Sequence, residues 1–270
     1  MAKLNLSLLD PDSTGKFKKK DEALPFTARS LLELYDQMYL LFAENKHSLL
    51  VILHGIDASG KDGVVNHIFS GANPQSLRVH SFKQPSDEEL RHDFLWRCHK
   101  LAPESGSAVI FNRSYYEEVT TVRVHPEMLK RQHLPDAILR DPDFFQGRYR
   151  HINEFERMLS ENGTQIVKFF LHISKDEQRE RLKDRLQDKT KHWKFSPQDI
   201  KERRYWTAHM AAFQEMIECT NTRWAPWHVI PSNHKWYRNH LVSEILVKSL
   251  KGLKMKFPKA TGGIDPRRLR

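Results

Sequence analysis

The fold is decided by residues 55–63, which read GIDASGKDG and fit the phosphate-loop pattern G-x-x-x-x-G-K. An unbroken apolar run, LLVIL at 49–53, precedes them, and a helical pattern over 64–69 follows. The pattern requires this order of strand, glycine-bearing loop and helix, because the glycines let successive backbone N–H groups face inward and the helix adds the positive end of its dipole. The stretch therefore predicts a loop that cradles phosphate.

The loop departs from the usual pattern at the residue after Lys61, where Asp62 replaces the Ser or Thr that normally binds Mg²⁺. Lys61 itself supplies a mobile positive charge for the phosphates. Asp57, inside the loop, would repel a bare phosphate, but it would attract a phosphate that carries Mg²⁺. We therefore expect a metal-dependent site in which Asp57 binds the ion.

Apolar runs and helical patterns alternate along the rest of the chain. Strands are expected at 49–53, 78–82, 108–111, 165–171 and 227–230, and helices at 29–45, 64–69, 87–101, 127–139, 147–161, 174–186, 196–218 and 236–253. Such alternation is typical of right-handed βαβ units and of a parallel sheet that helices cover on both faces. Ligands of these sheets bind at the carboxyl ends of the strands, so we expect the chemistry in the loops that follow them.

The loop after the third expected strand reads NRSYYEE at 112–118. In phosphate-loop enzymes this strand normally ends in an acid that orients Mg²⁺. Asn112 takes that place, as a neutral oxygen ligand or a partner of metal-bound water. Arg113 can bind a phosphate through two parallel hydrogen bonds. Glu117 and Glu118 either complete a metal site or form an acidic helix start, which the helix dipole favours in any case.

A cationic segment follows the fourth expected strand. Residues 175–194 are dense in Lys and Arg, and Arg181 and Arg185 lie one turn apart on one helical face. Acidic residues are interleaved with these cations, so one interpretation of the segment is an ordinary solvent-exposed helical face. The alternative is a helical lid over about 175–205, because P-loop kinases close such a lid, with its arginines, over the transferring phosphates.

The 270 residues carry a formal net charge of +10, which attracts polyanions without choosing among them. The start of the chain lacks the apolar core of a signal peptide, and no apolar run approaches the length of a membrane span. Cys98 and Cys219 are far apart and read as reduced thiols. We expect a cytoplasmic protein with no membrane partner and no nucleic-acid partner, since a nucleic-acid recognition motif is absent.

Ordered matches over residues 25–255 make the chain resemble the polyphosphate kinase 2 family. The matching stretches are GIDASGKDG at 55–63, SFK with the following proline at 81–85, FNRSYYE at 111–117, HISK at 172–175, WKFS at 193–196 and WAPW at 224–227. The resemblance implies an α/β protein with a three-layer P-loop kinase fold, a central parallel five-stranded sheet and a helical lid. It also implies dependence on Mg²⁺, with Mn²⁺ as a substitute, and a homo-oligomer, either dimer or tetramer. The implied reaction is reversible phosphoryl transfer between inorganic polyphosphate and nucleoside mono- and diphosphates.

The same resemblance assigns roles motif by motif. Catalysis is assigned to Asp57, Lys61, Arg113 and Arg181, and metal binding to Asp57 and Glu118. Binding of polyphosphate and nucleotide is assigned to Gly55, Ala58, Ser59, Gly60, Asp62, Gly63, Lys83, Asn112, Glu117 and Arg185. Asn112 and Glu117 look like the class III branch, which accepts both AMP and ADP, whereas Glu118 departs from the Asp or Asn common there.

The expected organisation is one phosphotransferase domain over 26–257, a mobile N-terminal arm over 1–25 and a basic C-terminal tail over 258–270. The alternative function is that of an ATP-dependent P-loop kinase acting on a small molecule or nucleotide. That alternative predicts a Ser or Thr after Lys61 and an acid at the end of the third strand, and the sequence has neither.

Overall fold

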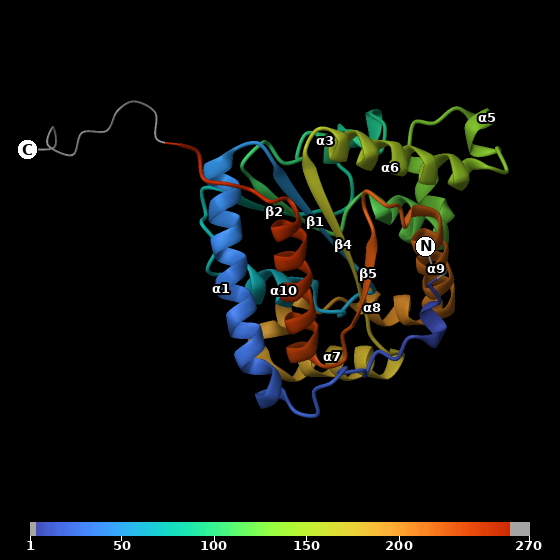
Figure 1. Ribbon diagram of the computed structural model, residues 1–270. Coiled ribbons are helices and arrows are strands. Elements are labelled where there is room, and N and C mark those ends of the chain that lie inside the picture. The colour runs from blue at the N-terminus through green and yellow to red at the C-terminus, as the bar shows by residue number, and fades with distance from the viewer. Residues whose placement is uncertain (1–3, 260–270) are drawn as a thin grey trace, which may run out of the picture.

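Figure 1 shows the computed structural model, which describes residues 4–259. Five parallel strands form one sheet in the order β2-β3-β1-β4-β5. The strands are β1 (Ser48–His54), β2 (Leu77–Ser81), β3 (Ala108–Asn112), β4 (Thr164–His172) and β5 (Trp227–Pro231). The expected α/β fold with a central parallel five-stranded sheet is therefore confirmed.

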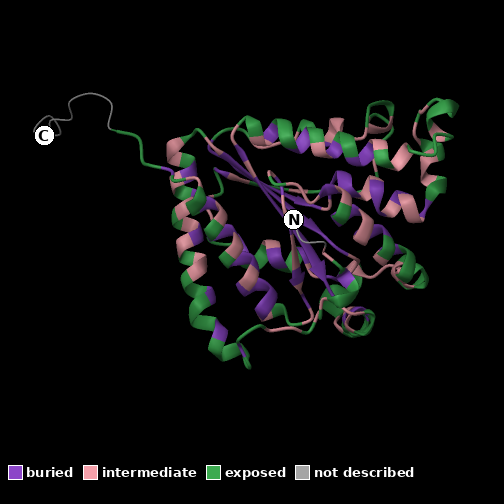
Figure 2. Ribbon diagram, turned by 45° about the vertical axis from the view of Figure 1, so that its right-hand side comes forward, coloured by how far each residue is buried: buried purple, intermediate pink, exposed green. Residues whose placement is uncertain are grey.

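Helices cover both faces of this sheet (Figures 1 and 2). The helices that cover the sheet are α1 (Lys20–Glu44), α2 (Lys61–Ile68) and α10 (Lys235–Gly252) on one face, and α6 (Phe144–Glu161) and α9 (Trp206–Thr220) on the other. The other helices are α3 (Trp96–His99), α4 (Thr121–Val124), α5 (Asp136–Leu139), α7 (Lys175–Gln187) and α8 (Pro197–Glu202). Turns of 3₁₀ helix are η1 (Leu6–Leu8), η2 (Glu89–Arg91), η3 (Tyr115–Val119), η4 (Pro126–Arg131), η5 (Lys189–Lys194) and η6 (Arg203–Tyr205).

The central strand β1 separates two apolar cores because its side chains alternate between the faces. Leu49, Val51 and Leu53 pack with α1, α2 and α10, whereas Leu50 and Ile52 pack with α6 and α9. All seven residues of β1 are buried, as expected for a strand covered on both sides. Because β1 is covered on both faces, the sequence before the phosphate loop is an unbroken apolar run.

Three expected helices are broken in the structure. In the segment 87–101 the Asp93 carboxylate accepts hydrogen bonds from the backbone of Leu95 and Trp96, so a new short helix starts there. In the segment 127–139, one turn ends at Arg131, and the next helix begins only after Pro135, because proline disfavours helical geometry in the residue before it. The expected helix over 196–218 is divided into α8 and α9 by the 3₁₀ turn η6.

The N-terminal segment packs against the domain, so the structure does not support the expected mobile arm over 1–25. Leu6 is buried in the core on the side of α6 and α9, and its backbone N–H donates to Gln214. Pro11 accepts a hydrogen bond from the backbone of Asn233, and α1 already begins at Lys20. The expected basic tail over 258–270 lies outside the described residues from position 260 onward.

A fully buried ion pair joins β4 to α6. The Lys168 ammonium lies 2.7 Å from Glu156 Oε2 and also donates to the Tyr116 hydroxyl and the Thr220 carbonyl. Neither charged side chain is exposed to solvent. Removing one partner of such a pair leaves the other charge buried without compensation.

None of the helices within residues 4–259 combines the length and the apolar character needed to cross a membrane.

Replacement of Lys168 by Met is expected to lower the free energy of unfolding by about 3–5 kcal/mol, because Glu156 loses its buried cation. Adding Glu156→Gln should recover part of this loss. Urea unfolding monitored by circular dichroism measures both effects. Lys251→Met, which removes an ion pair with Glu33 on the surface, serves as the control and should leave the midpoint nearly unchanged. A Lys168→Met protein as stable as this control would contradict the prediction.

Candidate phosphate-transfer site

The phosphate loop connects β1 to α2 and depends on glycine at two positions. Gly55 has φ +140° and Gly60 has φ +103°, values that side chains rarely adopt. A Cβ at Gly55 would lie 2.8 Å from the Leu171 carbonyl oxygen, and one at Gly60 would lie 2.0 Å from Arg238 Nη1. The loop backbone therefore packs closely against β4 at Gly55 and against the buried Arg238 side chain at Gly60.

The Lys61 side chain is buried and folds back over the loop. Its ammonium donates to the carbonyl oxygens of Gly55 at 2.7 Å and Ile56 at 3.2 Å. Burial, reinforced by the nearby charge of Arg113, lowers the pKa of Lys61 to about 8. The charge of Lys61 is thus held at the mouth of the loop, in a form that responds to pH close to neutrality.

An ion pair joins the phosphate loop to the loop after β3. Arg113 Nη2 lies 2.5 Å from Asp57 Oδ1, and the register that sets Leu53 beside Asn112 brings the two loops together. Burial raises the pKa of Asp57, but the charges of Arg113 and Lys61 outweigh it and leave that pKa below its usual range. Asp57 is therefore a carboxylate, and the structure brings together three of the four residues expected to be catalytic.

The fourth residue, Arg181, binds the backbone of the phosphate loop. Its side chain on α7 is buried, and Nη1 donates to the carbonyls of Ala58 and Ser59 at 2.9 Å each. Its Nε donates to Glu177 at 2.6 Å. These bonds fix the lid helix to the backbone of the phosphate loop.

Arg238 on α10 was not identified from the sequence. It is buried beneath the loop, where it hydrogen-bonds to Asn239 and would collide with any side chain at Gly60. Burial lowers the pKa of Arg238 to about 10, and the charge of Arg181 contributes. No local pattern distinguishes such an arginine from others in a basic helix, so only the tertiary fold reveals it.

Asn112 and Asp62 bind each other. Asn112 Nδ2 donates to Asp62 Oδ1 at 2.8 Å, and Lys194 from the lid donates to Oδ2 at 2.8 Å. The carboxylate that replaces the usual Ser or Thr therefore links the end of β3 to the lid.

Glu117 and Glu118 have separate surroundings although they are adjacent in sequence. Glu117 lies 3.8 Å from His54 and accepts a hydrogen bond from Thr121. Burial raises the pKa of Glu117, but the charges of His54 and Arg113 leave it below its usual range. Glu118 instead forms a 2.7 Å ion pair with Arg148. Glu118 is thus already neutralised, and its expected metal role loses support.

Of the remaining lid residues, Gln178 contacts the loop directly, whereas Arg185 influences it through its charge. Arg185 on α7 pairs with Asp199 on α8 at 3.3 Å, and its charge contributes to lowering the pKa of Asp57. Gln178, a buried residue that the sequence did not single out as a ligand, donates to the Asp57 carbonyl at 3.0 Å. Lys83 is exposed in the loop after β2.

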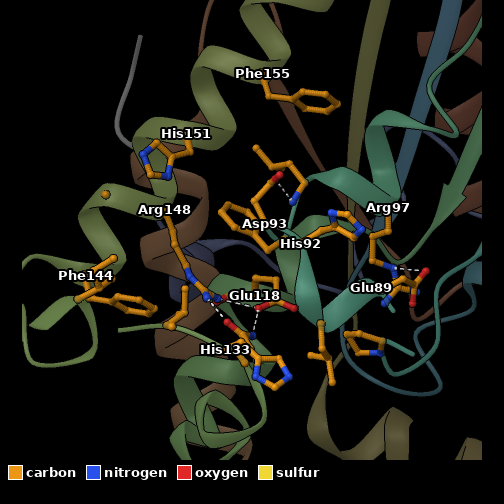
Figure 3. Close-up of a pocket in the computed structure, with 18 of the residues that line it drawn as sticks. Glu89, His92, Asp93, Arg97, Glu118, His133, Phe144, Arg148, His151 and Phe155 are labelled. Atoms are coloured by element: carbon orange, nitrogen blue, oxygen red, sulfur yellow. Dashed lines mark hydrogen bonds and ion pairs between the residues drawn. The ribbon is translucent and has the colours of Figure 1, made fainter. Parts of the chain in front are cut away.

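A cleft of about 870 Å³ lies between the segment 89–97 and helix α6 (Figure 3). Arg148 and Glu118 meet at its floor, and Phe144 and His92 line its walls. A smaller hollow shares Glu118 with this cleft and is lined also by Lys83, Ser114 and Glu117. The cleft therefore leads toward the loop after β3, and sequence reasoning missed it because its walls come from segments distant in the chain.

Comparison with known proteins gives consistent results. The family model described as Polyphosphate kinase 2 (PPK2) matches residues 17–258. The AMP/ADP-polyphosphate phosphotransferase of Meiothermus ruber is 47% identical over 260 residues, which cover 95% of this chain and 92% of that protein. The ADP-polyphosphate phosphotransferase of Rhodopseudomonas palustris is 43% identical over 252 residues, covering 93% and 87%. The crystal structure of polyphosphate kinase 2 from Arthrobacter aurescens TC1 superposes with a TM-score of 0.90 at 40% identity, covering 100% of this chain and 93% of that one.

Replacement of Gly60 by Ala is expected to destabilise the protein by about 1–3 kcal/mol, the cost of a strained backbone conformation, before any displacement of Arg238 is counted. Thermal unfolding measures the change. Gly147→Ala is the matched control, because no atom lies within 4 Å of its Cβ position and alanine is the better helix former by about 0.5–1 kcal/mol. Equal unfolding temperatures for the two variants would contradict the account of the loop.

Proposed function

The chain belongs to the polyphosphate kinase 2 family, and we propose that it transfers phosphoryl groups from polyphosphate to both AMP and ADP. Polyphosphate–nucleotide phosphoryl transfer is the activity by which its relatives are named. The observation that carries the proposal for this chain is the contact of Arg113 with Asp57 beside the buried Lys61. It sets two phosphate-binding cations and one metal-binding carboxylate at a single edge of the sheet.

The proposed mechanism needs positioning and neutralisation of charge more than covalent chemistry, because the transferred phosphoryl group passes through a loose transition state. Lys61 and the backbone N–H groups of 58–61 bind the phosphate from which transfer occurs. Arg113 binds the neighbouring phosphate across the gap. Arg181 acts as a positioning residue, since it holds the loop backbone in the shape that these contacts require. The reaction is reversible because one phosphoanhydride bond is broken in polyphosphate and another is formed in the nucleotide, and the same groups serve both directions.

Enzymes of this kind use a divalent metal, and we propose Mg²⁺ bound through Asp57, with Mn²⁺ as a substitute. The donor chemistry fits: Mg²⁺ is usually held by one or two carboxylates together with phosphate oxygens and water. Asp57 is ionised and about one-third exposed, whereas Glu118 is bound by Arg148. When bound, the ion neutralises charge on the phosphate oxygens. Because Arg148 already binds Glu118, we do not propose Glu118 as a metal ligand.

We place the acceptor nucleoside in the cleft beside α6. Its volume lies within the range of small-molecule sites. Phe144 and His92 offer flat rings for stacking against a base, and Lys83 lines the adjoining hollow, where the nucleotide phosphates would sit. Polyphosphate would then approach along the lid, past Arg185 and other cations. The +10 net charge of the chain favours that encounter.

We also propose a cytoplasmic homo-oligomer. Helix α1 carries several exposed apolar side chains that a second copy could cover: Leu24, Phe26, Leu32, Tyr39 and Phe42. A dimer or tetramer would appear in size-exclusion chromatography with light scattering.

Incubation of the purified protein with Mg²⁺, polyphosphate and AMP is expected to yield both ADP and ATP, and incubation with ADP should yield ATP. Arg113→Ala should lower kcat/KM by about 100- to 1,000-fold, as loss of one transition-state donor typically does. Arg140→Ala, which removes an exposed pair with Asp136 on α5, is the control and should keep full activity. Chromatography of the nucleotides is the measurement. Turnover with ATP as donor but none with polyphosphate would contradict the proposal and favour a small-molecule kinase.

The rate is expected to fall as pH rises through about 8, because the pKa of Lys61 in the free protein is about 8 and the neutral amine no longer attracts phosphate. The pH profile of kcat/KM reports this group, since that parameter follows ionisations of the free enzyme. In Lys61→Arg the inflection should disappear, because guanidinium stays charged. An unchanged inflection in this variant would assign it to another group.

A further inference from the structure

Three metal-binding side chains meet away from the phosphate loop, where the lid joins the body. His125 follows α4, Glu202 ends α8 and His209 lies in the first turns of α9. Their ligand atoms all lie within 4.8 Å of one another, and within residues 4–259 this is the one group of three such side chains. The function proposed above uses none of them.

The three side chains converge on one point. His125 Nε2 lies 2.8 Å and His209 Nε2 lies 3.2 Å from the same oxygen, Glu202 Oε2. A tetrahedral zinc ion with bonds of about 2.0–2.2 Å separates its ligand atoms by roughly 3.3–3.5 Å. The two distances to Glu202 would therefore lengthen by a few tenths of an ångström to admit an ion, and all three ligand atoms already lie within 4.8 Å of one another. Two histidines and one glutamate are a recurrent zinc ligand set that leaves one coordination position open.

The surroundings orient both imidazole rings. His125 Nδ1 lies 3.4 Å from Glu127 Oε1, and metal-bound histidines usually donate their second ring N–H to such a carboxylate. The ring of Tyr205 packs edge-on against His125, and Phe213 stacks on His209. Both histidine side chains are no more than 10% exposed. The ligands are thus preorganised in a largely dry position.

We propose that His125, Glu202 and His209 form a binding site for a late first-row divalent transition ion, with Zn²⁺ as the representative. Imidazole favours such ions, whereas Mg²⁺ prefers oxygen ligands, so this site is chemically distinct from the one at Asp57. Glu202 belongs to the lid, and both histidines belong to the body. A bound ion therefore ties the second half of the lid to the body.

An ion bound at Glu202 would restrain helix α8 of the lid. Helix α8 carries Asp199, which holds Arg185 at 3.3 Å, and Glu202 at its end. An ion at Glu202 therefore restrains the helix that positions an arginine facing the phosphate loop. The backbone of 197–205 becomes less free to open when the ion is bound.

Metal binding by the tag-free, chelator-treated full chain tests the proposal without measuring activity. After equilibration with Zn²⁺ and desalting, one ion per chain is expected, and Co²⁺ should give the intense visible absorption of a tetrahedral site. His209→Gln and Glu202→Gln should each weaken Zn²⁺ binding by more than ~100-fold, and Glu127→Gln by about 10-fold, the range found for outer partners. His47→Gln, which removes a histidine that pairs with Glu44 alone, should leave binding unchanged.

Hydrogen exchange supplies an independent readout: Zn²⁺ should increase protection over 197–205 in the unaltered protein and leave His125→Gln unaffected. Binding of Zn²⁺ that is equal in His209→Gln, Glu202→Gln and the unaltered protein would overturn the proposal. So would binding that is lost in Asp57→Asn instead. If a variant fails to fold, the Co²⁺ spectrum of the unaltered protein decides, because purely weak, octahedral absorption would contradict the proposed tetrahedral site.

Discussion

The structure depends on how positive charge is arranged around one short loop. Lys61, Arg113, Arg181 and Arg238 all lie against residues 55–63, and like charges at such distances repel strongly when they are buried. Each is bound by oxygen or amide partners that the fold supplies at fixed positions. Lys61 and Arg181 take carbonyls of the loop itself, Arg113 takes Asp57, and Arg238 takes Asn239. These partners offset the repulsion between the cations, so the loop can hold several positive charges close together for a polyanion.

The four cations fall into two groups with different roles. Arg181 and Arg238 are buried and pack against the loop at Gly60 and its neighbours. Lys61 and Arg113 lie where strands β1 and β3 end, and they are the residues that we propose to bind phosphate. Asp57 lies between the groups as the one carboxylate of the loop that Arg113 holds, which suits it to bind a metal that arrives with the phosphates. The lid thus contributes a structural arginine from its first half, whereas Arg185 and Lys194 are its candidates for contact with substrate.

Local sequence patterns predicted the parts of this site that depend on neighbours in the chain. The strand before residue 55, the glycine loop and the helix after it are all present, because one apolar run and two glycines specify them. Contacts between distant segments were beyond such reasoning. The spacing of Arg181 and Arg185 shows that they share a helical face, but not that Arg181 is buried against the loop. The same reason explains the missed Arg238 and the missed cleft between 89–97 and α6, because these segments are distant in the chain and only the tertiary fold brings them together.

The central claim is that Asp57 makes binding of polyphosphate dependent on metal. The most direct test is a calorimetric titration of the protein with polyphosphate of defined length, with and without Mg²⁺, for the unaltered chain and for Asp57→Asn. The account predicts that Mg²⁺ strengthens binding to the unaltered chain, and that Asp57→Asn binds without Mg²⁺ at least as well as the unaltered chain and gains little when Mg²⁺ is added. An equal effect of Mg²⁺ on both proteins would contradict it, because the ion would then be held by the phosphates or by other residues and not by the loop.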